Sequence, residues 1–254
     1  MSLYEAAALL KGEKGTHVSV KVRRGAGGPS DTDTLDLERS ALKRQAVSSK
    51  FCDLAQAEAG ADASPGSGQA AGYIRLGSFS DLTDVEVRAA VTRLKSEGVS
   101  EYVMDMRNNG GGSFESGVNV ARIFINEGII VNIADSKGIK DYVEAKNAAE
   151  DAESPLTVVV NGGTASAAEV LAGALKDNKR ATLVGEKTFG KGLIQTLVPL
   201  SDGSGVAVSV AKYQTPNEID INKKGIMPDR VTADLPSLAE DPCAIAAAAL
   251  RQDK

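Results

Sequence analysis

Residues 156–169, LTVVVNGGTASAAE, combine three local patterns in one short stretch. Residues 156–160 form a continuous apolar run, which is typical of a strand buried on both faces. Residues 161–163 are Asn-Gly-Gly, a composition that favours a tight turn, and a helix is predicted at about residues 166–176. A strand that leads through a turn into a helix is a basic unit of sheets covered by helices.

The same alternation of strand and helix extends to both sides of this segment. Strands are predicted at residues 73–79, 101–106, 129–133, 181–184, 193–200 and 206–213, and helices at residues 81–97 and 114–125. Strands and helices alternate first, and a run of strands follows. This order predicts an α/β protein in which a mixed β-sheet is flanked by helices.

The amino-terminal part has a different pattern. A short helix is predicted at residues 5–10, and residues 16–22 alternate between polar and apolar side chains as a half-buried strand does. A loop is expected at residues 25–33, followed by a further strand or helix at residues 34–47. Residues 55–72 are almost entirely Ala, Gly, Ser, Gln and Asp, which is typical of a flexible linker. We therefore place a domain boundary there.

Composition narrows the class of protein. The chain of 254 residues is 42% hydrophobic and 25% charged, a mix typical of globular proteins. Its longest apolar run, residues 243–250, is far shorter than the roughly 20 residues of a membrane-spanning helix. A net charge of −5 argues against a protein that binds nucleic acid electrostatically. The first residues lack the features of a signal or transit peptide.

Histidine and cysteine are scarce. The single histidine, His17, falls on the polar face of the strand predicted at residues 16–22, so we expect it to face solvent. Most hydrolytic triads and zinc sites use histidine, so either His17 does that work or the chemistry belongs to other residues. Cys52 and Cys243 form no Cys-x-x-Cys motif, and neither a zinc knuckle nor a redox dithiol is expected. Whether the two form a disulfide stays open.

Ser166 begins the helix predicted after the apolar strand. A hydroxyl in this position lies beside unpaired backbone N–H groups and the positive end of the helix dipole, an environment that stabilises an oxyanion. Ser166 and Glu169 also fit a capping box, in which they only satisfy the helix start. Gly162 and Gly163 allow a sharp turn and a close approach of another chain, which favours the functional interpretation.

Residues 185–192, GEKTFGKG, nearly match a phosphate-binding loop. Gly192 stands where that loop has Ser or Thr, and the strand predicted next replaces the helix that such a loop opens, so no nucleotide site is expected. Lys191 is an ordinary turn lysine or a lysine held inside a site. A desolvated lysine can activate a serine where histidine is absent. Ser166 and Lys191 flank one buried strand and could meet at its end, with Glu169 one helical turn from Ser166.

Five segments of the chain resemble, in order, those of the carboxy-terminal processing proteases, which are tail-specific serine peptidases with a Ser-Lys dyad. The matching segments are residues 72–79 (GYIRLGSF), 105–112 (DMRNNGGG), 163–169 (GTASAAE), 185–192 (GEKTFGKG) and 225–229 (GIMPD). The resemblance implies Ser166 as nucleophile, Lys191 as general base and then acid, and Glu169 as the residue that orients the dyad. The implied oxyanion hole consists of backbone N–H groups, that of Ala167 and that of Gly111 or Gly112.

The resemblance also implies a reaction. The expected enzyme is an endopeptidase that cleaves protein substrates near their carboxyl terminus through an acyl-enzyme, with no metal and no cofactor. Residues 134–136, 173–180 and 200–205 are most similar to the plant and algal branch, which trims a photosystem II reaction-centre precursor in the thylakoid lumen. A bacterial periplasmic relative is the alternative. We expect a monomer that binds a protein tail, contacts a membrane-embedded substrate peripherally, and binds neither nucleic acid nor nucleotide.

One part of the family pattern is incomplete. Residues 4–24 resemble the last helix and strand of the family's PDZ domain, and the preceding part of that domain is absent from the sequence. The expected domains are residues 1–50 (a truncated PDZ domain remnant), 51–72 (a linker), 73–232 (the Ser-Lys peptidase core) and 233–254 (a tail). A non-catalytic relative that binds protein tails is the alternative function. We expect the Lys191 amine within hydrogen-bonding or one-water reach of the Ser166 hydroxyl.

Overall fold

The chain divides into two units. The computed structural model describes residues 6, 9–23, 32–40, 46–55, 69–146, 149–202 and 204–253. The units are Met1–Arg44 and Gln45–Lys254. None of the helices in these described ranges is long and apolar enough to cross a membrane.

In the described part of the amino-terminal unit, β1 (His17–Arg23) and β2 (Thr32–Glu38) form an antiparallel pair. The side chain of His17 is exposed, and its Nδ1 lies 3.0 Å from Asp36 Oδ2. The predicted solvent-facing position of His17 is therefore confirmed. Most of the helix predicted at residues 5–10 and of the loop at residues 25–33 lies outside the described residues, and the assignment of this unit to a PDZ domain stays a prediction.

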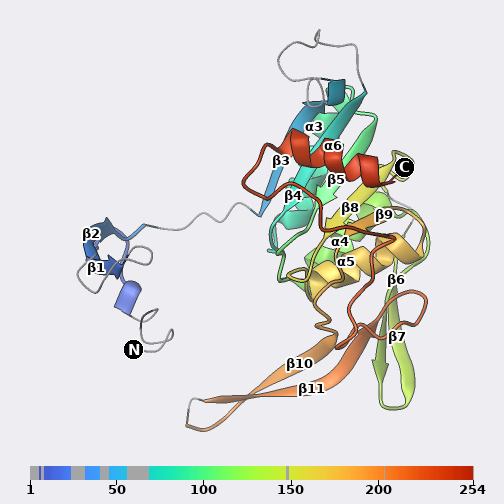
Figure 1. Cartoon of the computed structure of the whole chain (residues 1–254). Helices are drawn as coiled ribbons and strands as arrows, with labels where there is room; N and C mark the ends of the chain where they lie inside the picture. Colours follow the sequence, from blue (N-terminus) through green and yellow to red (C-terminus); the bar gives the residue numbers. More distant parts are fainter. Residues whose placement is uncertain are drawn as a thin grey trace. The chain divides into compact units, whose positions relative to one another are not determined.

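The larger unit is built on a six-stranded sheet with the strand order β12-β9-β8-β5-β4-β3 (Figure 1). Its strands, in chain order, are β3 (Val47–Asp53), β4 (Ala70–Leu76), β5 (Glu101–Asp105), β8 (Leu156–Val160), β9 (Thr182–Gly185) and β12 (Arg230–Val231). All neighbouring strands are parallel except β3 and β4, which are antiparallel. The mixed α/β fold predicted from the sequence is confirmed.

Helices cover both faces of this sheet (Figure 1). One face packs against α3 (Thr83–Ser96), α4 (Phe114–Phe124) and α5 (Ala167–Asp177), and the other against α6 (Pro242–Asp253). Successive residues of a strand point to opposite faces, so Met104 and Val158 are buried on the first face, whereas Val103 and Val159 are buried on the second. Burial on both sides explains why these strands are continuously apolar.

A second, four-stranded antiparallel sheet has the order β10-β11-β6-β7. Its strands are β6 (Ile129–Asp135), β7 (Gly138–Glu144), β10 (Leu193–Pro199) and β11 (Gly205–Gln214). The β10–β11 ribbon extends away from the helices and the larger sheet (Figure 1). Because β10 begins directly after residues 185–192, this ribbon starts beside the loop that carries Lys191.

Three elements differ from the sequence prediction. β3 lies where the end of the first domain and the start of the linker were expected. The larger unit therefore begins before residue 51. Residues 56–68 of the expected linker lie outside the described part of the chain. β7 forms in a polar stretch. α6 forms within the expected tail, because its apolar residues are buried against the sheet. The positions of β3 and α6 depend on partners far away in the sequence.

A disulfide joins two of these unpredicted elements. Cys52 of β3 and Cys243 of α6 are bonded, with their Cα atoms 5.2 Å apart and 191 residues between them in sequence. The question that the sequence left open is answered by this pairing. Through it, the edge strand is tied covalently to the helix that covers one face of the sheet.

Removing the disulfide should destabilise the larger unit. The double variant Cys52→Ser, Cys243→Ser should lose about 4 kcal/mol of unfolding free energy, because a long closed loop restricts the unfolded chain. Urea denaturation followed by circular dichroism measures the change. A reducing agent should lower the stability of the unmodified chain to that of the double variant and leave the double variant unchanged. A loss below about 1 kcal/mol would contradict this assignment of its role.

Candidate active site

Four loops meet at the carboxyl ends of the parallel strands of the six-stranded sheet. The parallel strands β4, β5, β8 and β9 end there, and the loops that follow them contain most of the segments singled out in the sequence. Backbone hydrogen bonds join the loops: Phe79 N–H to the Gly111 carbonyl (3.0 Å), Ala165 N–H to the Asn109 carbonyl (2.8 Å), and Phe189 N–H to the Thr164 carbonyl (3.0 Å). Ligand sites of open α/β sheets form at this kind of edge.

Ser166 stands at the amino end of α5 with φ of 59° and ψ of −121°. Such a conformation costs a non-glycine residue about 1–3 kcal/mol and is concentrated at functional sites. The turn before it is fixed by Asn161, whose Oδ1 accepts hydrogen bonds from the N–H groups of Gly163 (3.0 Å) and Asn108 (2.8 Å). The predicted capping box is present. The side chain of Ser166 is half-buried, so part of it remains accessible to solvent.

The carboxylate of Glu169 connects the serine to the lysine loop. Glu169 is fully buried, and its Oε2 accepts hydrogen bonds from the backbone N–H of Ser166 (3.0 Å) and of Lys191 (2.8 Å). Its Oε1 accepts from Thr188 Oγ1 (2.5 Å) and Gly190 N–H (2.7 Å). One carboxylate therefore fixes the backbone at both residues of the candidate dyad.

The side chain of Lys191 is exposed. The hydrogen bonds among the described residues include none between its Nζ and Ser166 Oγ, and the expected approach of the two groups, directly or through one water, stays a prediction. The backbone N–H groups of Ser166 and Lys191 are linked through the carboxylate of Glu169, which accepts a hydrogen bond from each. Glu169 thus contacts the peptide groups of the dyad and not the lysine amine.

The candidate donors to an oxyanion are the backbone N–H of Ala167, which follows Ser166, and those of Gly111, which packs against Ser166, and of the next residue, Gly112. Gly111 N–H already donates to Asn109 Oδ1 at 2.9 Å, whereas those of Gly112 and Ala167 have no acceptor among the described residues. Gly112 has φ of +138°, and a Cβ atom there would lie 2.0 Å from the carbonyl oxygen of Phe79. Only glycine fits at this position, and of the two glycines considered from the sequence the geometry favours Gly112.

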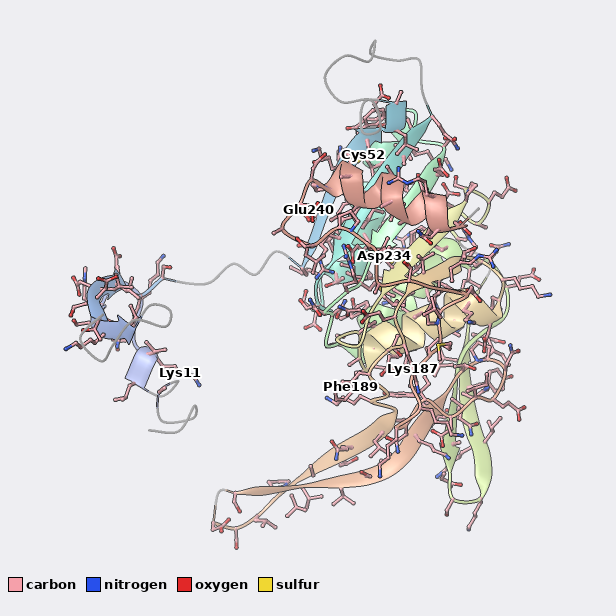
Figure 2. The ribbon with its side chains drawn as sticks, in the orientation of Figure 1. Lys11, Cys52, Lys187, Phe189, Asp234 and Glu240 are labelled. Atoms are coloured by element: carbon pink, nitrogen blue, oxygen red, sulfur yellow. A yellow bond between two sulfur atoms is a disulfide. The ribbon has the colours of Figure 1, made fainter. Side chains whose placement is uncertain are left out.

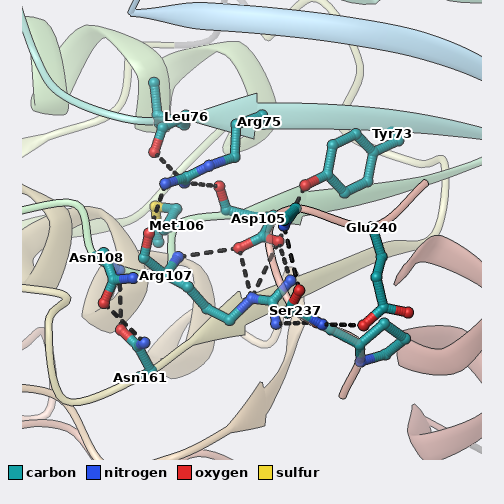
Figure 3. Close-up of polar contacts among 12 residues, drawn as sticks. Tyr73, Arg75, Leu76, Asp105, Met106, Arg107, Asn108, Asn161, Ser237 and Glu240 are labelled. Carbon is teal, nitrogen blue, oxygen red and sulfur yellow. Dashed lines mark hydrogen bonds and ion pairs between the residues drawn. The ribbon is translucent and has the colours of Figure 1, made fainter. Parts of the chain in front are cut away.

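A buried ion pair, drawn in Figure 3, lies at the start of the segment that leads to Gly111 and Gly112. Arg107 donates to the carboxylate of Asp105, with Nη2 to Oδ2 at 2.6 Å, and both side chains are buried. Burial disfavours the charge of Arg107, but the hydrogen bond and charge of Asp105 outweigh burial and raise its pKa. Burial and the nearby Asp105 carboxylate raise the pKa of Tyr73, whose hydroxyl donates to Asp105 at 3.0 Å. A complete, hydrogen-bonded pair of this kind fixes the loop geometry.

The guanidinium of Arg75 completes this support. Its Nη1 donates to the Asp105 carbonyl at 2.7 Å, and its Nη2 donates to the Arg107 carbonyl at 2.6 Å. Sequence reasoning included these residues in matching segments but gave them no role, since their contacts join strand ends that are distant in the sequence.

Residues 225–229 hold the lysine loop from the other side. The Ile226 N–H donates to Thr188 Oγ1 at 2.7 Å, and the Thr188 N–H donates to the Ile226 carbonyl at 3.1 Å. Gly225 has φ of +66°, and a Cβ atom there would lie 2.3 Å from the Thr188 carbonyl oxygen. The glycine therefore permits the close approach that fixes this loop.

The segment after residues 185–192 bears on the comparison with a phosphate-binding loop. β10 follows residues 185–192 as a strand, which confirms the predicted difference from a phosphate-binding loop. Within the described ranges, no three His, Cys, Asp or Glu residues are grouped so that they could hold a metal ion.

Comparison with known proteins gives a consistent result. The family model of "Peptidase family S41" matches residues 70–232. The chain is 51% identical over 230 residues to the "C-terminal processing peptidase, chloroplastic" of Tetradesmus obliquus, covering 90% of this chain and 49% of that protein. It is 45% identical over 231 residues to the "Carboxyl-terminal-processing protease" of Synechocystis, covering 91% of this chain and 51% of that protein.

A solved structure is similar over nearly the whole chain. It is named "Photosystem II D1 C-terminal processing protease", is 48% identical, and superposes with a TM-score of 0.76 over 99% of this chain and 65% of its own. The chain spans about half the length of the curated relatives that it matches.

Proposed function

The chain belongs to peptidase family S41, and from this premise we propose that it is a serine-type endopeptidase that cleaves protein substrates near their carboxyl terminus with a Ser-Lys dyad. The carboxylate of Glu169 carries the proposal. It accepts hydrogen bonds from the backbone of both Ser166 and Lys191. A nucleophile and its base must be close to one another, and this shared acceptor supports such an arrangement.

In the proposed reaction, Ser166 Oγ attacks the carbonyl carbon of the scissile peptide while the neutral amine of Lys191 accepts the hydroxyl proton. The N–H groups of Gly112 and Ala167 stabilise the oxyanion, the second one at the positive end of α5. The Lys191 ammonium then gives its proton to the leaving nitrogen as the C–N bond breaks. Water then attacks the acyl carbon and gives a proton to Lys191. Lys191 passes this proton to Ser166 Oγ as the acyl–oxygen bond breaks and the carboxylic acid leaves.

The finer parts of the proposal concern substrate and location. The name of the similar solved structure, "Photosystem II D1 C-terminal processing protease", supports a photosystem II D1 precursor as the substrate. On this proposal the protein acts as a monomer in the thylakoid lumen, in peripheral contact with a membrane-embedded substrate, with the bacterial periplasm as the alternative location. The amino-terminal unit, with β1 and β2, would be the carboxy-terminal part of a PDZ domain.

A non-catalytic protein that holds protein tails is the second candidate. The observation in its favour is the exposed side chain of Lys191, which makes no hydrogen bond to Ser166 in the described structure. Lysine has a long, flexible stem, however, and the fixed backbone leaves its side chain free to turn toward the serine. We therefore favour the peptidase.

Cleavage of a protein with a defined tail tests the proposal. The chain is incubated with a soluble carrier protein that ends in the carboxy-terminal tail of the D1 precursor, and mass spectrometry is used to detect the released fragment. We expect cleavage of this protein, none of the same carrier without the tail, and no inhibition by a metal chelator. Binding of the tail without release of a fragment would contradict the peptidase and favour the tail-binding protein.

A further inference from the structure

Phe189 is the most exposed aromatic side chain in the described part of the chain, with an exposed fraction of 65%. It lies in residues 185–192, between the buried residues Thr188 and Gly190. Figure 2 shows it near the point where the β10–β11 ribbon leaves the core. A large apolar side chain in water forgoes the stabilisation that burial would provide, so a partner that covered the ring would gain it.

The backbone at Phe189 is held rigidly. Its N–H donates to the Thr164 carbonyl at 3.0 Å, and its two neighbours are both bonded to Glu169 Oε1, Thr188 through Oγ1 and Gly190 through N–H. These contacts use backbone groups and a neighbouring hydroxyl, so none of them requires an aromatic ring at position 189. The ring is therefore presented to solvent from a fixed position.

That position is next to both residues of the candidate dyad. Phe189 precedes Lys191 by two residues, and Thr164, to which its backbone is bonded, precedes Ser166 by two residues. A substrate whose scissile bond reaches Ser166 must pass close to this loop. Contact with a substrate side chain would bury the exposed ring.

We propose that Phe189 contacts an apolar side chain of the substrate beside the scissile bond and makes the enzyme prefer that side chain, an inference that rests on the proposed peptidase function. The surrounding charges agree with an apolar occupant. On the same loop Lys187 and Lys191 are exposed cations and Glu186 is an exposed anion, so the loop is positive on balance. Lys223 N–H donates to the Gly190 carbonyl at 2.8 Å, and β10 has no ionisable side chain. A basic substrate residue would be repelled here, whereas an apolar one would gain contact.

A series of peptides tests this role in the full chain. Nine-residue peptides of Ala, Gly and Ser carry a single leucine, glycine or lysine at successive positions around the bond that is cut, which mass spectrometry locates. We expect unmodified protein to favour leucine over glycine at one position by about tenfold in kcat/KM, the size of an ordinary apolar contact in a binding pocket. Phe189→Ala should reduce this preference to about twofold or less, and Phe189→Tyr, which keeps the ring, should retain it.

Tyr142→Ala is the matched control. Tyr142 is also an exposed aromatic side chain, on β7 at the opposite edge of the four-stranded sheet from β10, and its removal should leave the leucine preference unchanged. Both alanine variants should keep the thermal midpoint of the unmodified chain. An unchanged leucine preference in Phe189→Ala overturns this inference and leaves the peptidase intact. Failure of the unmodified chain to cleave any peptide overturns the proposed function, and this inference with it.

Discussion

Replacing Ser166 by alanine should abolish cleavage, with kcat/KM reduced by at least about 10⁴-fold. The change removes only the Oγ atom, which is the proposed nucleophile. The N–H bond to Glu169 Oε2 stays, and loss of the side-chain half of the capping box costs about 1 kcal/mol, too little to unfold a domain. The loss should therefore come from chemistry and not from the fold. Release of the tail fragment from the D1-tailed carrier measures the activity, and circular dichroism measures folding.

Ser96→Ala serves as the control for this substitution. Ser96 ends α3 and its Oγ donates to the Arg93 carbonyl at 2.6 Å, a local contact away from the strand ends where Ser166 lies. This variant should cleave at the rate of the unmodified chain. Binding of the tail to Ser166→Ala should also be unchanged, since the proposed recognition does not use the hydroxyl. Cleavage retained in Ser166→Ala would remove Ser166 as the nucleophile.

The central strands could be predicted because burial on both faces leaves a local signature. β8, β5 and β9 are short apolar runs, and each was expected within a few residues of its observed bounds. β3 and α6 have no such signature. β3 alternates irregularly and is placed by pairing with β4, and α6 is placed by packing on the sheet and by a disulfide to a residue 191 positions away. Contacts over such distances leave no mark on local periodicity.

The candidate site shows the same division. Ser166, Glu169 and Lys191 lie in motifs that could be recognised along the chain, and the expectation that they converge at the end of one strand agrees with their shared contacts. The way in which Glu169 acts could not be foreseen, because a carboxylate one helical turn from a serine could bond to the lysine amine or to the backbone. The Asp105–Arg107 pair was missed for a related reason: its surroundings come from several strand ends.

Lys191→Arg should reduce kcat by about 10³-fold or more, comparable to the loss of a catalytic group. Arginine keeps the positive charge and a similar length, but its guanidinium cannot lose a proton and so cannot act as the base. The fold should be unaffected, because the Lys191 side chain is exposed and the bond to Glu169 comes from its backbone N–H. Single-turnover cleavage of the D1-tailed carrier gives the rate, and KM should stay within about threefold of the unmodified value, since only the proton acceptor is lost.

Lys187→Arg, on the same loop and also exposed, controls for the introduction of an arginine into this loop. It should cleave at the unmodified rate, whereas a loss in both variants would mean that the larger guanidinium group disturbs the loop and that Lys191 need not be the base. The double variant Ser166→Ala, Lys191→Arg is the stricter measurement. If the two residues act as one unit, it should be no slower than Ser166→Ala alone, because a base contributes nothing without its nucleophile. If the rate of the double variant instead fell by the product of the two single reductions, Lys191 would serve some step other than activation of Ser166.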